Sequence, residues 1–139
     1  MVNGFLLVDD DSDDSELFCE ALHEVDTSIH CHFALDGNEA LNMLQEINPS
    51  VIFLDINMPG MNGWDCLTKL KSSEESKHIP VIMYSTSSHK TEVEKAFTLG
   101  ALSFFSKPND YKQLKAMLLE VVEKINNGTL ESLAKTFKG

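Results

Sequence analysis

Val51-Ile52-Phe53-Leu54-Asp55 is a short apolar run that ends abruptly in a carboxylate. Its continuous apolar character predicts a strand that is buried on both faces, as in a parallel sheet covered by helices. The run at residues 5–8, which is followed by Asp9, Asp10 and Asp11, repeats this design near the start of the chain. Two buried strands that end in acids indicate that these acids meet at one edge of the sheet.

Strand patterns and helix patterns alternate along the rest of the chain. Alternating or continuous apolar residues predict three further strands, at residues 29–34, 80–84 and 102–106, the first of them near a sheet edge. Apolar residues at helical spacing predict five helices, at residues 12–25, 40–47, 64–72, 93–99 and 110–125. This alternation indicates an α/β domain in which helices cover both faces of a parallel sheet.

Capping and turn residues mark where the helices begin and end. Ser12 is expected to cap the first helix, and Gly100 is expected to end the fourth in the left-handed conformation. Residues 1–127 should form one domain, and residues 128–139 an extension with no separate output domain. The helical spacing of the apolar residues in the extension predicts one more short helix; these residues are Leu130, Leu133, Ala134 and Phe137. We expect this helix to pack on the domain's own surface or, alternatively, on a second subunit.

The composition excludes several classes of partner. The chain has 22 acidic residues against 11 basic ones, all lysines, and a formal net charge of -11, so nucleic acid is not an expected partner. No apolar run is long enough to span a bilayer, and the first residues do not form a signal-peptide pattern. We therefore expect a cytoplasmic protein without a membrane partner.

The cysteines and histidines form no recognisable site. Cys19, Cys31 and Cys66 are odd in number and widely spaced, which favours reduced, partly buried thiols. His30 and His32 would share one face of a strand and offer zinc two ligands, but no third ligand lies at a recognisable spacing. We therefore expect neither a disulfide framework nor a zinc site.

Polar side chains at the ends of the buried strands should converge in space. Asp9 and Asp10, Asp55, Ser85 and Lys107 each stand at the carboxyl end of a predicted strand. Carboxylates that close together remain ionised only around a cation, and their hard oxygen ligands select Mg²⁺. A lysine and a hydroxyl opposite would hold an anion, so the set predicts phosphoryl transfer to Asp55. Taken singly, each of these residues could instead be an ordinary cap, turn or surface residue.

The chain resembles the receiver domain of bacterial two-component response regulators, the chemotaxis-regulator-like domain, from about residue 5 to residue 125. The motifs that carry the resemblance are specific in their order and spacing, namely Leu6-Leu7-Val8-Asp9-Asp10-Asp11, Val51 to Gly63, Ser85-Thr86, Leu99-Gly100-Ala101 and Lys107-Pro108. The hydroxyl-rich segment at residues 85–88 is similar to that of stand-alone receivers related to phytochrome-linked regulators.

The resemblance implies a flavodoxin-like, doubly wound sheet of five strands in the order 2-1-3-4-5. It also implies that Asp55 accepts a phosphoryl group from a histidine kinase or histidine phosphotransferase. Asp10, Asp55 and the Asn57 carbonyl would bind Mg²⁺, and Asp9 would act through metal-bound water. Lys107 would pair with the phosphoryl oxygens.

The same resemblance implies a conformational switch. Ser85 would turn toward the phosphoryl group and Phe104 would swing inward, which changes the surface of the fourth helix and fifth strand for a downstream protein. Phe104 could equally be an ordinary core residue, because Phe105 offers the other face. The Lys107–Pro108 peptide bond would be cis. The protein would help to catalyse its own phosphorylation and dephosphorylation.

Other functions stay open at this stage. A phosphorelay intermediate or a phosphate sink would use the same residues. A phosphatase of the haloacid-dehalogenase type needs a second acid where this chain has Asn57, and a flavin site needs a phosphate cradle that the first turn lacks. A structural interaction module that has lost phosphorylation is a third alternative, but the presence of the complete set of site residues argues against it. A monomer or weak homodimer is expected, since the charged dimer interface common in receivers uses arginine, which this chain lacks.

Overall fold

The computed structural model describes residues 4–58, 60–86, 89–134 and 136–138. Its strands are β1 (Gly4–Val8), β2 (His30–Ala34), β3 (Val51–Leu54), β4 (Val81–Ser85), β5 (Ser103–Ser106) and β6 (Thr136–Lys138). Its helices are α1 (Ser12–Val25), α2 (Gly37–Met43), α3 (Gly63–Ser72), α4 (Lys90–Thr98), α5 (Tyr111–Asn126) and the 3-10 turn η1 (Leu130–Leu133).

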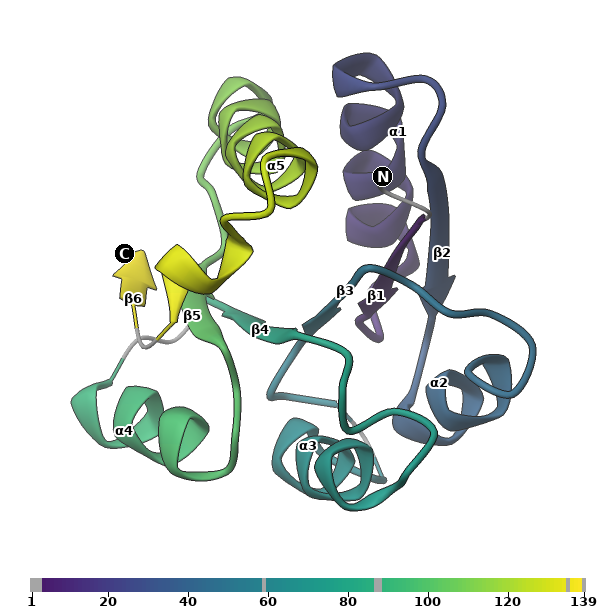
Figure 1. Ribbon diagram of the computed structural model, residues 1–139, viewed down its shortest axis with the longest axis vertical. Coiled ribbons are helices and arrows are strands. Elements are labelled where there is room, and N and C mark those ends of the chain that lie inside the picture. Colours follow the sequence, from purple (N-terminus) through teal and green to yellow (C-terminus); the bar gives the residue numbers. More distant parts are fainter. Residues whose placement is uncertain (1–3, 59, 87–88, 135, 139) are drawn as a thin grey trace.

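The strands of the described residues form one parallel sheet in the order β2-β1-β3-β4-β5-β6. The predicted order of the first five strands and the five helices are confirmed, and β2 lies at an edge as expected. The helices lie on both sides of the sheet, with α1 and α5 on one face and α2, α3 and α4 on the other (Figure 1). This is the flavodoxin-like arrangement that the sequence predicted.

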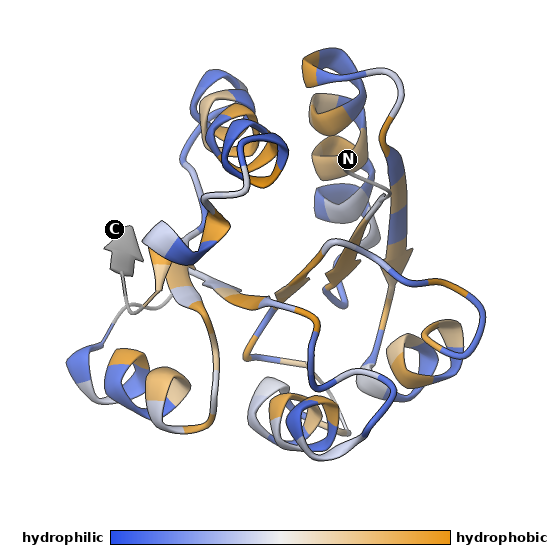
Figure 2. Cartoon of the chain, in the orientation of Figure 1, coloured by the Kyte–Doolittle hydropathy of each residue, from blue (hydrophilic) through white to orange (hydrophobic). Residues whose placement is uncertain are grey.

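Two apolar layers hold the helices on the sheet, because successive strand residues point to opposite faces. The layer under α1 and α5 contains Phe5, Phe18, Phe53, Phe105 and Leu118. The layer under α2, α3 and α4 contains Leu6, Ile52, Leu67, Met83 and Phe104. Figure 2 shows the hydrophobic residues concentrated in the central strands, while hydrophilic residues recur along the helices.

The helix ends agree only in part with the sequence prediction. Gly100 ends α4 with a φ of 102°, as predicted for a left-handed stop. The cap of α1 is Asp11 rather than Ser12, because the Asp11 side chain accepts hydrogen bonds from the backbone N–H groups of Asp13 and Asp14. A carboxylate at this position also interacts favourably with the helix dipole.

The C-terminal extension differs from the single short helix that was predicted. Within its described residues, 128–134 and 136–138, η1 is the helical part, and residues 136–138 pair in parallel with β5 as a sixth strand. Lys135, which the predicted helix included, lies outside the described residues. A short helix is marginal, whereas the open edge of β5 offers partners to backbone N–H and C=O groups. Leu130 and Leu133 are buried in the layer under α1 and α5, so η1 packs on the domain's own surface.

Cys19 of α1 and Cys31 of β2 form a disulfide with a Cα–Cα distance of 5.4 Å. The prediction of reduced thiols is therefore wrong for these two residues, while Cys66 is free and buried. The error arose because the fold, rather than the spacing in the sequence, brings a helix position beside a strand position.

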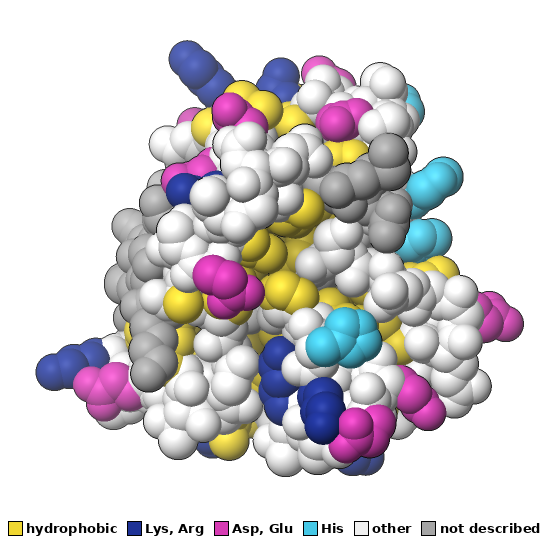
Figure 3. All heavy atoms as spheres, in the orientation of Figure 1, with side chains coloured by type: hydrophobic (Ala, Val, Ile, Leu, Met, Phe, Trp, Pro, Cys, Tyr) yellow, Lys and Arg dark blue, Asp and Glu magenta, His cyan; other side chains and the backbone are white. Residues whose placement is uncertain are grey.

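Acidic side chains and hydrophobic atoms occupy different parts of the face drawn in Figure 3. On the face drawn in Figure 3, acidic side chains are scattered around the periphery, and hydrophobic atoms are visible at the centre. Among the described residues, no helix is both long enough and apolar enough to cross a bilayer.

Candidate functional site

The parallel register delivers the predicted site residues to one edge of the sheet. Asp9 directly follows β1 and Asp55 directly follows β3; the Asp55 N–H donates to the Val8 carbonyl over 2.9 Å. Lys107 directly follows β5, and its N–H donates to the Ser85 carbonyl over 2.9 Å. Backbone pairing therefore fixes the starting positions of these side chains.

Three carboxylates gather at this edge. Oxygens of Asp9, Asp10 and Asp55 all lie within 4.8 Å of one another; Asp9 is fully buried, Asp55 is nearly so, and Asp10 is exposed. This all-oxygen set, open to solvent at Asp10, has the donor chemistry that a divalent cation such as Mg²⁺ or Mn²⁺ requires. The residues present therefore fit a metal of this class.

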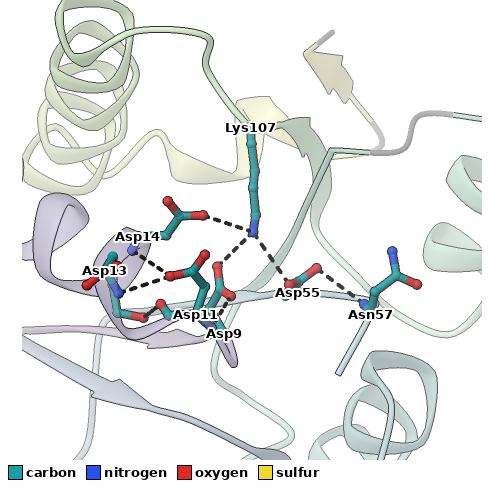
Figure 4. Close-up of polar contacts among 8 residues, drawn as sticks. Asp9, Asp11, Asp13, Asp14, Asp55, Asn57 and Lys107 are labelled. Carbon is teal, nitrogen blue, oxygen red and sulfur yellow. Dashed lines mark hydrogen bonds and ion pairs between the residues drawn. The ribbon is translucent and has the colours of Figure 1, made fainter. Parts of the chain in front are cut away.

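Lys107 joins the acids from the opposite side (Figure 4). Its Nζ lies 2.8 Å from Asp9 Oδ2 and 3.5 Å from Asp55 Oδ2. The lysine side chain is largely buried, and Nζ also lies 5.6 Å from the centre of the Tyr84 ring. The ammonium therefore occupies a confined position between the two buried acids.

Local backbone hydrogen bonds orient the two buried carboxylates. Asp9 Oδ1 accepts from the Asp11 N–H over 3.0 Å, and Asp55 Oδ1 accepts from the Asn57 N–H over 3.2 Å. The other oxygen of each carboxylate is the one that faces Lys107. Each acid is thus held at both oxygens.

The buried environment changes the ionisation of these groups. Burial raises the pKa of Asp55 to about 6, with the charge of Asp9 acting in the same direction and Lys107 opposing it. Burial also opposes the charge on Lys107, yet its hydrogen bond to Asp9 and the charges of Asp55, Asp9 and Asp14 together raise its pKa. Asp55 is therefore ionised only at a cost in the absence of a cation.

The predicted switch residues lie beside this site. Ser85 ends β4 and is fully buried, and Phe104 of β5 is fully buried in the layer under α2, α3 and α4. Phe105 faces the opposite layer. Ser87 and Ser88, which belong to the hydroxyl-rich segment at residues 85–88, lie outside the described residues.

The Lys107–Pro108 peptide bond differs from the resemblance. No peptide bond among the described residues is cis, so the expected cis bond is wrong for this structure. The trans form is the intrinsically favoured one for most residue–proline bonds. Lys107 reaches Asp9 and Asp55 with this trans bond in place.

Sequence reasoning missed two residues at the site. The sequence-based prediction gave Asp14 no place at the site, but its Oδ2 lies 4.0 Å from Lys107 Nζ. The predicted third helix began at residue 64, but α3 begins at Gly63, directly against the backbone of Asp55 and Ile56. A Cβ on Gly63 would collide with the Asp55 carbonyl oxygen and lie 2.6 Å from Ile56 Cα. Neither contact has a local sequence signal.

Comparison with known proteins identifies relatives of this chain. The response regulator receiver domain matches residues 5–119. Chemotaxis protein CheY of Pseudomonas aeruginosa is 33% identical over 91 residues, which cover 66% of this chain and 73% of that protein. The sensory transduction protein LytT of Oceanobacillus iheyensis is 36% identical over 94 residues, which cover 68% of this chain but only 37% of LytT. The chain thus spans little more than a third of LytT.

Two solved structures of response regulators share this fold. The phosphorylated cyanobacterial phytochrome response regulator RcpA matches with a TM-score of 0.80 and 27% identity, over 89% of this chain and 94% of that one. The Mn²⁺-bound form of response regulator Rcp1 matches with a TM-score of 0.75 and 28% identity, over 86% of this chain and 91% of that one.

Proposed function

This chain belongs to the response regulator receiver domain family, and on that premise we propose that Asp55 accepts a phosphoryl group and switches a protein-binding surface. One observation carries the proposal. Asp9, Asp10 and Asp55 gather within 4.8 Å, and Lys107 contacts the two buried members of this group. Catalysis of phosphoryl transfer consists mainly of such positioning and charge neutralisation.

Mg²⁺ is the proposed cofactor. Asp9, Asp10 and Asp55 would hold the cation, together with the Asn57 carbonyl, and Asp9 would do so through water. When bound, the cation supplies positive charge that allows the acids to stay ionised together and that offsets charge on the phosphoryl group. Because protons compete for Asp55, metal binding should strengthen as the pH rises through the Asp55 pKa of about 6.

The proposed reaction is transfer from a phosphohistidine. An ionised Asp55 oxygen forms a bond to phosphorus, the bond between phosphorus and the histidine ring nitrogen breaks, and the electron pair leaves with that nitrogen, which a proton then neutralises. Lys107 would form an ion pair with a negatively charged phosphoryl oxygen on Asp55. Its Nζ already lies 3.5 Å from Asp55 Oδ2, so a short movement suffices.

Phosphorylation would bias the conformation of the α4 and β5 surface. Ser85 ends β4 beside Lys107, and Phe104 lies two strand positions before Ser106 on β5. Movement of Ser85 toward the phosphoryl group would change the packing around Phe104, which is already fully buried in this structure. Receiver domains act with histidine kinases and downstream targets; for this chain we propose a cytoplasmic switch in which residues 1–127 form the receiver.

A small phosphodonor with Mg²⁺ tests this function directly. Wild-type protein should acquire a phosphoryl group from phosphoramidate or acetyl phosphate, and the matched variant Asp65→Asn should do so equally, because Asp65 is an exposed acid on α3. Asp55→Asn should acquire none while keeping its circular dichroism spectrum. Undiminished labelling of Asp55→Asn would place the acceptor on another residue and remove the proposal.

A further inference from the structure

We infer that Asp14 is a positioning residue that holds the Lys107 ammonium on the α1 side of the site and thereby slows phosphorylation of Asp55. The inference rests on the proposed function of Asp55 and adds a determinant of its rate. It arises because Asp14 contacts the site lysine without belonging to the group of acids that fits a metal.

Asp14 and Asp55 lie on opposite sides of Lys107 (Figure 4). Lys107 Nζ is 3.5 Å from Asp55 Oδ2 and 4.0 Å from Asp14 Oδ2, while Asp9 Oδ2 lies closest at 2.8 Å. The two flanking carboxylates therefore pull the ammonium in opposite directions. Removal of either charge should shift the balance toward the other.

The position of Asp14 is fixed by the start of α1. The Asp11 side chain accepts from the N–H groups of Asp13 and Asp14 over 3.0 and 3.1 Å, and the Ser15 hydroxyl donates to the Asp11 carbonyl over 2.9 Å. These bonds anchor the first turn of the helix. The side chain of Asp14 is thereby presented to Lys107 from a rigid element.

Asp14 and Lys107 also share one cavity. Its volume is about 250 Å³, and its wall also includes Tyr84, Tyr111 and a third charged residue, Asp110, whose carboxylate caps α5 by accepting from the Gln113 N–H over 2.8 Å. The Tyr84 ring lies beside Lys107 Nζ, and the pKa of Tyr84 is raised, first by burial and then by the charges of Asp9, Asp14 and Asp55. The phenol therefore stays neutral, and it leaves Asp14 as a charged partner for the lysine on this side.

The attraction of Asp14 for Lys107 should matter more when a divalent cation is bound, which is the state that accepts the phosphoryl group. Asp9, Asp10 and Asp55 lose part of their attraction for Lys107 when they share a divalent cation, whereas Asp14 lies outside their group and keeps its charge. Lys107 must leave Asp14 to pair fully with the incoming phosphoryl group. The Asp14 carboxylate also repels an anionic donor, so both effects slow the reaction.

The competing explanation is that Asp14 only stabilises the start of α1. The side chain of Asp14 is 52% exposed, and acids in the first turn of a helix interact favourably with its dipole. Asp13 supplies the matched control, because it lies in the same turn and carries the same charge. A purely helical role predicts that Asp13→Asn and Asp14→Asn behave alike.

The test compares phosphorylation rates of Asp14→Asn, Asp14→Glu and Asp13→Asn with wild type, using acetyl phosphate and Mg²⁺. Asp14→Asn should react about three- to fivefold faster at low salt, with the gain shrinking at high salt. Asp14→Glu should restore most of the slow rate, and Asp13→Asn should stay close to wild type. Equal or slower labelling of Asp14→Asn, or the same gain in Asp13→Asn, would overturn the inference.

A second readout needs no metal and no donor. In metal-free protein, Asp14→Asn should shift the NMR signals of the Lys107 ε-methylene and Nζ, and Asp13→Asn should leave them in place. Unchanged Lys107 signals in Asp14→Asn would also overturn the inference. Asp55→Asn reports on the proposed function separately, since labelling of that variant would remove the acceptor whatever Asp14 does.

Discussion

The edge of the sheet at Asp55 and the apolar layers beneath it follow opposite physical rules. At the edge, Asp9 and Asp55 are buried beside each other with one lysine between them, and burial raises the pKa of Asp55. In the layers, aromatic and aliphatic side chains pack without charge, as where Phe53 contacts the rings of Phe5 and Phe18. The layers supply stability, and the edge stores unfavourable charge that a cation and a phosphoryl group can relieve.

The largest expected effect lies in the layer under α1 and α5. Phe53 is fully buried, and four aromatic rings, of Phe5, Phe18, Tyr84 and Phe105, lie between 5.1 and 6.3 Å from its own. Phe53→Ala should lower the free energy of unfolding by about 4 kcal/mol in urea denaturation. Leu119→Ala, at a side chain that is 46% exposed, is the control and should cost less than about 1 kcal/mol. Similar losses in both variants would break the comparison.

Gly63 tests the boundary between the two regions. An added Cβ would meet the backbone of Asp55 and Ile56, which cannot move aside as a side chain can, so Gly63→Ala should cost about 3 kcal/mol and weaken Mg²⁺ binding. Gly37 is a matched control, because it also begins a helix but its Cβ would meet the flexible side chain of Met61. Gly37→Ala should therefore cost less. Calorimetric metal titrations that are equal in the two variants would contradict this.

The Cys19–Cys31 disulfide should stabilise the fold without serving the site. It closes a loop with a sequence separation of 12, for which chain entropy predicts roughly 3 kcal/mol. The double variant Cys19→Ser/Cys31→Ser should lose about this much stability and keep the phosphorylation of Asp55. A reductant should lower the stability of wild type alone; an equal effect on the double variant would show that the bond is not its target.

Asp55→Asn should raise the free energy of unfolding, whereas the preceding variants should lower it. The pKa of Asp55 in the folded protein, about 6, exceeds the ordinary aspartate value of 3.8, so the folded state binds the proton more tightly and loses stability as the pH rises between these values. Asparagine cannot ionise, so in chelator-treated protein the variant should become more stable than wild type by about 3 kcal/mol near pH 7.5, with little gain near pH 4. A stability difference between Asp55→Asn and wild type that does not change with pH would contradict the claim that ionised Asp55 destabilises the folded state.

The alternation of strands and helices was predictable because it depends on local apolar patterns. The runs at residues 5–8 and 51–54 identified the central strands, and the acids that follow them identified the site edge. Parallel strands then bring Asp9, Asp10 and Asp55 together whatever their separation in the sequence. This part of the site followed from general rules of sheet topology.

Contacts set by the packing of side chains were not predictable in this way. Cys19 and Cys31 meet only because α1 lies beside β2, and Asp14 meets Lys107 only because the start of α1 lies beside the end of β5. Residues 136–138 show the same limit, since their strand depends on the open edge of β5. Local pattern carries no information about such partners.

One NMR titration tests the central claim most directly. Mg²⁺ should first shift the amide signals of Asp10 and Asn57, and beryllofluoride added afterwards should shift those of Ser85 and Phe104, because a phosphoryl mimic on Asp55 should reposition the switch. Asp55→Asn should show no beryllofluoride response. Signals of Ser85 and Phe104 that stay in place in the wild-type protein would contradict the account and leave the acidic edge without a switch.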